Sequence, residues 1–254
     1  MTELVRYEVG GGVATITLDS PHNRNALSAQ LVAELSARLA EAGADPAARA
    51  VVLTHAGKVF CAGADLKAAG TGSIDDAGTA IMALLTAITE LPKPVIARIA
   101  GHVRAGGMGI VGACDLAVAA EGASFAFTEA RIGLAPAMIS LTTLDIMDPR
   151  QAARYYLTGE TFGPEVAAQL GLITIAAPDG ELDSVVDGLV AQILQTSPQG
   201  SAETKKLLTA ARRERLETRG QEMAALSARL FASDEAQEGI HAFLERRTPA
   251  WRSG

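Results

Sequence analysis

The chain has 254 residues, of which 48% are hydrophobic and 20% charged, as in a folded globular protein with a sizeable core. Its net charge of −7 argues against a nucleic-acid-binding protein with a broad basic field, and two cysteines are too few for a disulfide framework or a zinc site. Neither a signal-peptide pattern nor an apolar run of about 18 residues is present, so we expect a cytoplasmic protein without a membrane span.

The first three quarters of the chain alternate predicted strands with helices. Residues 13–18 alternate in polarity as a strand does, and Ser28 can cap a helix that runs to about Ala42. Further strands are predicted over 50–54, 94–100, 116–120 and 124–127, with a helix over 81–88. Strand, turn and helix recur to about residue 175, which indicates an α/β core.

The remainder of the chain is predicted to be helical. Helices are expected over 182–194, from Pro198 onward, over 222–231 and over 235–247. We therefore divide the chain into a core over 1–195 and a C-terminal helical region over 196–254. The basic run 212–215 is expected on a solvated helix face. Within the core, the small, glycine-rich segment 67–78 could form a lid or pocket rim.

Two segments place small residues where a strand leads into a helix. They are CAGADL at residues 61–66 and GHVRAGGMG at residues 101–109. Glycine permits close approach of the backbone, and the first turn of a helix offers unpaired N–H groups, so two facing turns would form an oxyanion hole. The alternatives are a plain connection capped by Asp65, and close packing of a helix on a sheet at Gly106 and Gly107.

Residues 107–112 also match the dinucleotide-binding fingerprint G-x-G-x-x-G. That fingerprint should begin where its strand ends, yet residues 101–106 intervene after Ile99. An acidic residue is not clearly placed about 20 residues further on, where the fingerprint requires one. A nicotinamide cofactor is therefore not expected.

Glu129 is a carboxylate among apolar and small residues, in the segment 125–133. Burial would raise its pKa and suit it to exchange protons near neutral pH. The alternative is a salt bridge to Arg131 or Arg104. The four histidines show no ligand-like spacing, so no metal site is expected, and no Gly-x-Ser-x-Gly elbow is present.

Taken together, these segments resemble the crotonase superfamily, the enoyl-CoA hydratase/isomerase family. The matching stretches follow one another from about residue 13 to 250, and include NRNALS (23–28), FCAGADL (60–66), GG (106–107), ACDL (113–116), FTEARIGLAP (127–136), YLTGE (156–160), AQLGLI (168–173) and EGIHAFLERR (238–247). The resemblance implies a crotonase-like spiral of ββα turns with a helical C-terminal region, assembled as a homotrimer or a dimer of trimers. It also implies an acyl-CoA thioester as substrate, so that coenzyme A is part of the substrate and no separate cofactor is expected.

The resemblance also implies the roles of particular residues. The N–H groups of Ala64 and Gly106 would hold the thioester oxygen, with Glu129 as the catalytic carboxylate. Contacts to coenzyme A would come from Arg24, Ala26, Ala62, Asp65 and Leu66, while Phe243 and Arg246 would reach the coenzyme A of a neighbouring subunit. Met108, Gly109, Met138 and Ile139 would line the acyl pocket.

One departure from the family pattern concerns the catalytic carboxylates. Many hydratases of the family hold the attacking water between two glutamates; Glu129 matches one, but the other position is Gly109. Ala105 also replaces a frequent glycine, and the segment 137–140 replaces a glycine-rich stretch, which should narrow the acyl pocket. The glycine at position 109 together with the segment PAMIS at 136–140 resembles methylglutaconyl-CoA-type hydratases.

We therefore expect a hydro-lyase of fatty-acid-type metabolism that acts on a 2-enoyl-CoA thioester. The alternatives are a Δ3,Δ2-enoyl-CoA isomerase, which needs one carboxylate and no water, and a non-catalytic acyl-CoA-binding protein. The length and branching of the acyl group stay open, as does a distal carboxylate that Arg104 or His102 could recognise. Trimer and hexamer also remain alternatives.

Overall fold

A computed structural model describes residues 2–66 and 74–252 of the chain. The strands are β1 (Val5–Gly10), β2 (Val13–Leu18), β3 (Ala50–His55), β4 (Val59–Cys61), β5 (Val95–Ile99), β6 (His102–Arg104), β7 (Leu116–Ala120), β8 (Phe125–Ala126) and β9 (Ile175–Ala177). The helices are α1 (Ala29–Ala44), α2 (Ile74–Glu90), α3 (Gly106–Ala113), α4 (Ser140–Thr143), α5 (Pro149–Thr158), α6 (Pro164–Gln169), α7 (Leu182–Gln195), α8 (Pro198–Phe231) and α9 (Asp234–Glu245), with short 3₁₀ turns η1 (Pro21–Asn23), η2 (Glu129–Ile132) and η3 (Ala250–Arg252).

The strands form two sheets, and the chain passes repeatedly from one to the other. The larger sheet has the order β1-β2-β3-β5-β7-β9, antiparallel only between β1 and β2, and the smaller has the parallel order β4-β6-β8. Strands β3, β5 and β7 are each followed by a strand of the smaller sheet, and the first two pairs then lead into α2 and α3. This spiral of ββα turns confirms the predicted α/β class.

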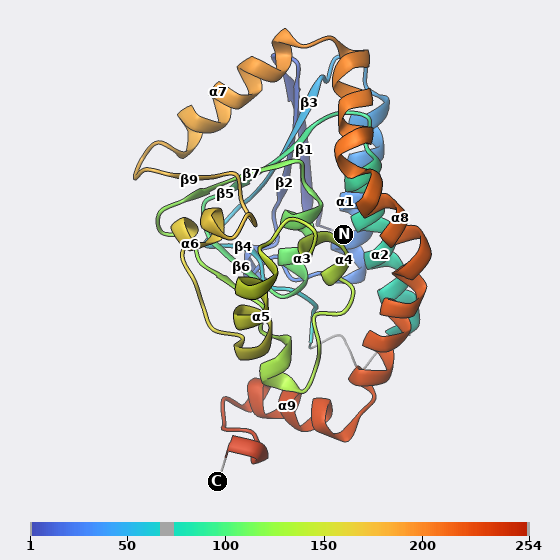
Figure 1. Cartoon of the computed structure of the whole chain (residues 1–254), viewed down its shortest axis with the longest axis vertical. Coiled ribbons are helices and arrows are strands. Elements are labelled where there is room, and N and C mark those ends of the chain that lie inside the picture. The colour runs from blue at the N-terminus through green and yellow to red at the C-terminus, as the bar shows by residue number, and fades with distance from the viewer. Residues whose placement is uncertain (1, 67–73, 253–254) are drawn as a thin grey trace.

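The central strands β3, β5 and β7 of the larger sheet are buried on both faces, as their continuous apolar runs require, whereas β1 is mostly exposed. In β3, Val51 and Leu53 face the main hydrophobic core, whereas Val52 faces a second, smaller core. Helix α7 covers the smaller core, and α1, α2 and α8 lie on the opposite side (Figure 1). The main core lies between the sheet and these three helices, and the carboxyl ends of β4 and β6 lead into the two glycine-containing turns.

The predicted elements agree with the structure in most places. Residues 13–18 form β2, and Ser28 caps α1 by accepting a hydrogen bond from the Leu31 N–H at 3.3 Å. Strands β1, β4, β6 and β9 were missed, as were the helices α4, α5 and α6. The proposed lid lies mostly on residues outside the described part of the chain, and α2 begins earlier than expected, at Ile74.

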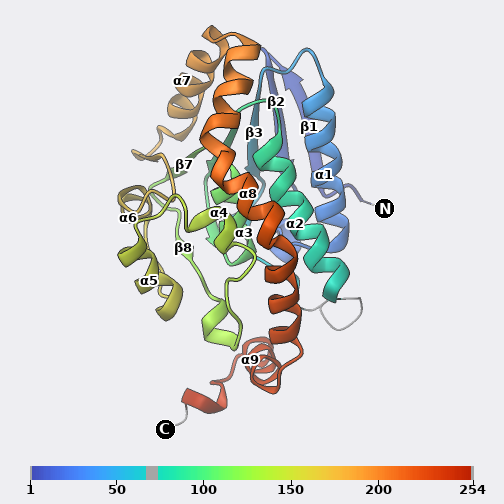
Figure 2. The ribbon, with the colours of Figure 1, turned by 45° about the vertical axis from the view of Figure 1, so that its right-hand side comes forward.

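Helix α8 is a single helix of 34 residues that lies along α2 (Figure 2). Lys205, on its inner side, forms a buried ion pair with Asp115 at 2.7 Å and donates to the carbonyls of Ile88 and Lys93. The expectation that residues 212–215 form a solvated face is wrong for Arg212. Its side chain is buried and pairs with Asp145 at 3.2 Å, because it lies on the same inner stripe.

Helix α9 closes the end of the molecule where η2 lies (Figure 1). A Cβ atom at Gly239 would lie 2.5 Å from the Ile132 carbonyl, so only glycine lets α9 approach η2 this closely. Over the described residues, no helix combines the length and the apolar character that a membrane span needs.

Candidate active site

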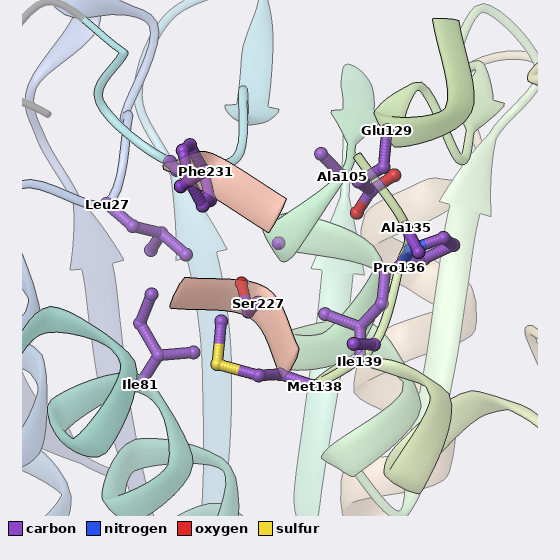
Figure 3. A pocket seen from close by; sticks show the side chains of 13 residues that line it. Leu27, Ile81, Ala105, Glu129, Ala135, Pro136, Met138, Ile139, Ser227 and Phe231 are labelled. Carbon is purple, nitrogen blue, oxygen red and sulfur yellow. The ribbon is translucent and has the colours of Figure 1, made fainter. Parts of the chain in front are cut away.

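A small pocket of about 60 Å³ lies between the two glycine-containing turns, η2 and α8 (Figure 3). The structure brings Ala64, Gly106 and Glu129 together at this pocket, although 65 positions separate the first from the last in sequence. Met138 and Ile139 also line it, as the sequence predicted. The three groups that carbonyl chemistry needs therefore share one site.

The two turns lie against each other at their glycine-containing ends. Gly63 has a φ of +90°, and a Cβ atom there would lie 2.7 Å from the Ala105 Cβ and 3.1 Å from the Gly106 nitrogen. A Cβ atom at Gly106 would in turn lie 3.8 Å from the Ala64 nitrogen. Neither Ala64 nor Gly106 donates its N–H to a backbone acceptor within the described ranges. Two adjacent free donors are the geometry of an oxyanion hole.

Ala105 sets the direction of the second turn. Its φ of 47° and ψ of −120° belong to a region that residues with a Cβ atom rarely occupy. The conformation is held by the Ala105 N–H, which donates to the Ala126 carbonyl, and by its own carbonyl, which accepts from Met108 N–H. This turn starts α3 at Gly106, whose N–H is unpaired because the first turn of a helix leaves its donors free.

Glu129 begins η2 and carries a buried carboxylate (Figure 3). Its Oε2 atom has no hydrogen-bond partner among the described residues, and desolvation raises the pKa of the carboxyl to about 7. The salt bridge considered from the sequence does not form: Arg131 donates to the Thr158 carbonyl, and Arg104 donates to Ser124. In the part of the chain that the structure describes, the carboxylate accepts a hydrogen bond only from its own backbone N–H, which lowers the pKa by less than burial raises it. A buried carboxylate with one free oxygen that can change charge near neutrality is suited to proton transfer.

Gly109 lies outside the described lining of the pocket, behind Ile139. A Cβ atom at position 109 would lie 2.6 Å from Ile139 Cγ2, so the isoleucine occupies the space into which a side chain would project. Met108 is fully buried in α3 and does not line the pocket either. Two residues therefore account for the absence of a second carboxylate: Gly109 has no side chain, and Ile139 fills the space that one would need.

The segments expected to bind coenzyme A lie beside the first turn. The Ala62 N–H donates to the Arg24 carbonyl at 3.1 Å, and Leu27 N–H donates to the Gly63 carbonyl at 2.8 Å. These bonds join the loop that carries Arg24 and Ala26 to the turn that carries Ala62, Asp65 and Leu66. The structure thus places all five predicted contacts in two adjoining segments.

The other predicted contacts lie elsewhere. Phe243 is 52% exposed near the end of α9 and Arg246 follows that helix, and neither lines the described pocket. His102 and Arg104 both bond to Ser124 and are likewise outside it.

Sequence reasoning missed part of the pocket wall. Ser227 and Phe231 of α8, Ile81 of α2, and Leu27 also line the pocket. The α8 residues lie four positions apart, and Ser227 continues the buried stripe of that helix. The buried positions of α8 are mostly polar, charged or small, whereas Leu207 and Leu208 are exposed, so no apolar repeat in the sequence marked this stripe.

Comparison with known proteins agrees with the chemistry that this pocket suggests. A family model described as "Enoyl-CoA hydratase/isomerase" matches residues 8–254. A solved structure of an enoyl-CoA hydratase from Mycobacterium avium is 54% identical, covers 99% of this chain and all of its own, and superposes with a TM-score of 0.92.

Two further relatives carry a related name. A carnitinyl-CoA hydratase structure from Mycobacterium avium is 30% identical with a TM-score of 0.86, over the whole of both chains. A carnitinyl-CoA dehydratase from Escherichia coli strain K12 is 32% identical over 260 residues, covering 99% of each chain. Full-length matches of this kind show common ancestry, and the fold and the pocket agree with them. The chain therefore belongs to the enoyl-CoA hydratase/isomerase family of the crotonase superfamily.

Proposed function

We propose that the protein is a hydro-lyase that adds water to, or removes it from, a 2-enoyl-CoA thioester with one carboxylate. The observation that supports this most is the buried Glu129 carboxylate, whose Oε2 atom has no partner among the described residues and which shares a pocket with the free N–H groups of Ala64 and Gly106. The relatives named as hydratases and dehydratases of CoA esters support the same reaction class.

In the hydration direction, Glu129 takes a proton from water while the water oxygen forms its bond to C3. The electron pair of the C2–C3 double bond moves toward the thioester carbonyl and gives an enolate. The Ala64 and Gly106 N–H groups stabilise the oxygen of that enolate. Protonated Glu129 then returns its proton to C2, so that one water molecule has been added and the carboxylate is regenerated.

Both parts of the site are required for this reaction. Loss of one oxyanion-hole donor typically raises a barrier by about 2.7–4 kcal/mol. A positioned acid or base contributes about 10²–10⁴-fold in rate, which is a similar free energy. A pKa of about 7 gives Glu129 both protonation states near neutral pH, as a group that takes and returns one proton requires.

A second candidate is a Δ3,Δ2-enoyl-CoA isomerase, in which Glu129 moves a proton between two carbons. The packing of Ile139 against Gly109 favours this candidate, because it leaves no room for a second carboxylate to hold a water molecule. Product mass distinguishes the two reactions, since hydration adds one water molecule and isomerisation adds nothing.

The test is a mass-spectrometric assay with a panel of 2-enoyl-CoA and 3-enoyl-CoA esters, which includes a branched dicarboxylic 2-enoyl ester of the methylglutaconyl type. Gain of one water on a 2-enoyl ester supports the hydro-lyase. A moved double bond at constant mass identifies the isomerase instead. Binding of every ester without any product would contradict both and leave the non-catalytic reading.

We further propose that the protein works as a homotrimer or a dimer of trimers. Phe243 and Arg246 are exposed at the end of α9 and lie outside the described pocket of their own chain, which leaves both side chains free to contact a neighbouring subunit. Light scattering on the purified protein measures the assembly, and a monomer at assay concentration would contradict the proposal.

A further inference from the structure

Ser227 is a polar residue on the inward side of α8. The buried positions of that helix follow one another at intervals of three or four residues, and comprise Lys205, Thr209, Arg212, Leu216, Gly220, Met223 and Ser227. Ser227 is only 8% exposed and lines the acyl side of the pocket (Figure 3). Its position is therefore fixed by a long helix that Lys205 and Arg212 anchor to the core.

The Ser227 hydroxyl has no hydrogen-bond partner in the described part of the chain. Two threonines of the same helix behave differently: Thr209 donates to the Lys205 carbonyl at 2.8 Å, and Thr218 donates to the Glu214 carbonyl at 2.7 Å. A hydroxyl inside a helix usually donates its hydrogen bond in this way, to a carbonyl of the preceding turn. Ser227 makes none, so its hydrogen-bonding capacity is left for whatever occupies the pocket.

The immediate surroundings of Ser227 are apolar. Ile81, Met138 and Phe231 line the same side of the pocket, and Glu129 lies across from them (Figure 3). The Ser227 oxygen is not among the fully enclosed atoms that lack a partner, so it remains accessible, and Ser227 lines the pocket. Pockets obtain specificity from a few polar groups in an apolar wall. A neutral hydroxyl in this setting matches a neutral oxygen better than a carboxylate, which would lose its hydration without gaining a cation.

We propose that Ser227 determines acyl specificity by hydrogen bonding to an uncharged oxygen, a hydroxyl or keto group, carried on the acyl chain beyond the reacting carbons. This inference rests on the proposed acyl-CoA site. The thioester oxygen is assigned there to Ala64 and Gly106, and C2 and C3 to Glu129. The part of the acyl group beyond C3 therefore meets the wall formed by Ile81, Met138, Phe231 and Ser227.

The first experiment measures binding and needs no turnover. Calorimetry compares butyryl-CoA with 4-hydroxybutyryl-CoA, and valeryl-CoA with 5-hydroxyvaleryl-CoA, on the full chain. We expect the wild-type protein to bind at least one hydroxylated ester about tenfold more tightly than its plain partner. Ser227→Ala should abolish that preference and leave the affinity for the plain esters unchanged within about twofold. Alanine is a good helix former, so the variant should fold.

A matched control is Ser36→Ala on α1, which removes a hydroxyl that donates to the Val32 carbonyl, away from the pocket. It should leave the preference intact. The proposal is overturned if the wild-type protein shows no preference for either hydroxylated ester. It is equally overturned if Ser227→Ala weakens plain and hydroxylated esters alike, because that would indicate a packing role.

Turnover of the corresponding 2-enoyl esters separates this inference from the proposed function. A binding preference that depends on Ser227, without addition of water to any ester, would refute the hydro-lyase and retain the specificity role. Addition of water to plain and hydroxylated esters at equal kcat/KM, with equal affinities, would retain the hydro-lyase and refute the specificity role.

Discussion

Two buried carboxylates in this molecule have opposite surroundings. Asp115 accepts a hydrogen bond from the Val95 N–H at 2.7 Å and pairs with Lys205 at 2.7 Å. Glu129 has one carboxylate oxygen without any partner among the described residues. The Asp115 pair holds α8 against the core, whereas Glu129 lines the pocket. Burial alone does not mark a functional carboxylate; burial without a partner does.

The largest expected effect comes from Glu129→Gln. The amide keeps the shape of the side chain but can neither take nor return a proton, so turnover of a CoA ester should fall by about 10³-fold. Affinity for the ester, measured by calorimetry, should stay within about threefold, because the oxyanion donors belong to the backbone. Glu160→Gln is the control, since Glu160 is an exposed partner of Arg154. Retained turnover in Glu129→Gln would remove Glu129 from its catalytic role.

The paired carboxylate should instead respond in stability. Lys205→Met removes the cationic partner of Asp115 and leaves a buried negative charge uncompensated. The free energy of unfolding, measured by urea titration, should fall by about 3–5 kcal/mol. Adding Asp115→Asn removes the uncompensated charge, so the double variant should recover more than half of the loss. If the two losses simply add, the ion pair is not what fastens α8.

Gly109→Glu tests whether the packing of Ile139 excludes a second carboxylate at position 109. A Cβ atom at position 109 meets Ile139 Cγ2 at 2.6 Å, so the single variant should lose about 1–3 kcal/mol of stability from overpacking. Adding Ile139→Ala should restore part of that stability by opening the space. Thermal unfolding of both variants measures this. A single variant as stable as the wild-type protein would show that Ile139 yields easily.

The smallest effect concerns the pH dependence of stability. The folded pKa of Glu129, about 7, lies above the ordinary value of 4.5 for a glutamate, so between these pH values the folded state holds a proton that the unfolded state has released. The stability that protonated Glu129 contributes to the folded state is therefore full below pH 4.5 and is lost as the pH rises through 7. Glu129→Gln lacks this loss, and its melting temperature should exceed that of the wild-type protein by several degrees at pH 8 but not at pH 5. Equal differences at both pH values would contradict the raised pKa.

The sequence by itself determined the class of the fold and the chemistry of the turns. Strand alternation at 13–18, the Ser28 cap and the small-residue turns are local features, and each appears in the structure where it was predicted. Glu129 was identifiable because a carboxylate in an apolar segment is unusual. Local polarity and backbone conformation decide such features, and both can be read from neighbouring residues.

Only the tertiary structure decided what surrounds these groups. That Glu129 lacks a partner depends on Arg131 and Arg104 each finding another acceptor. Ile139 closes the space at Gly109 from 30 positions away, and the buried side of α8 brings Ser227 to the pocket from nearly 100 positions beyond Glu129. These contacts arise from the packing of helices across a sheet. Their geometry depends on side-chain volumes and on the angles at which helices pack, and neither can be read from a local sequence pattern.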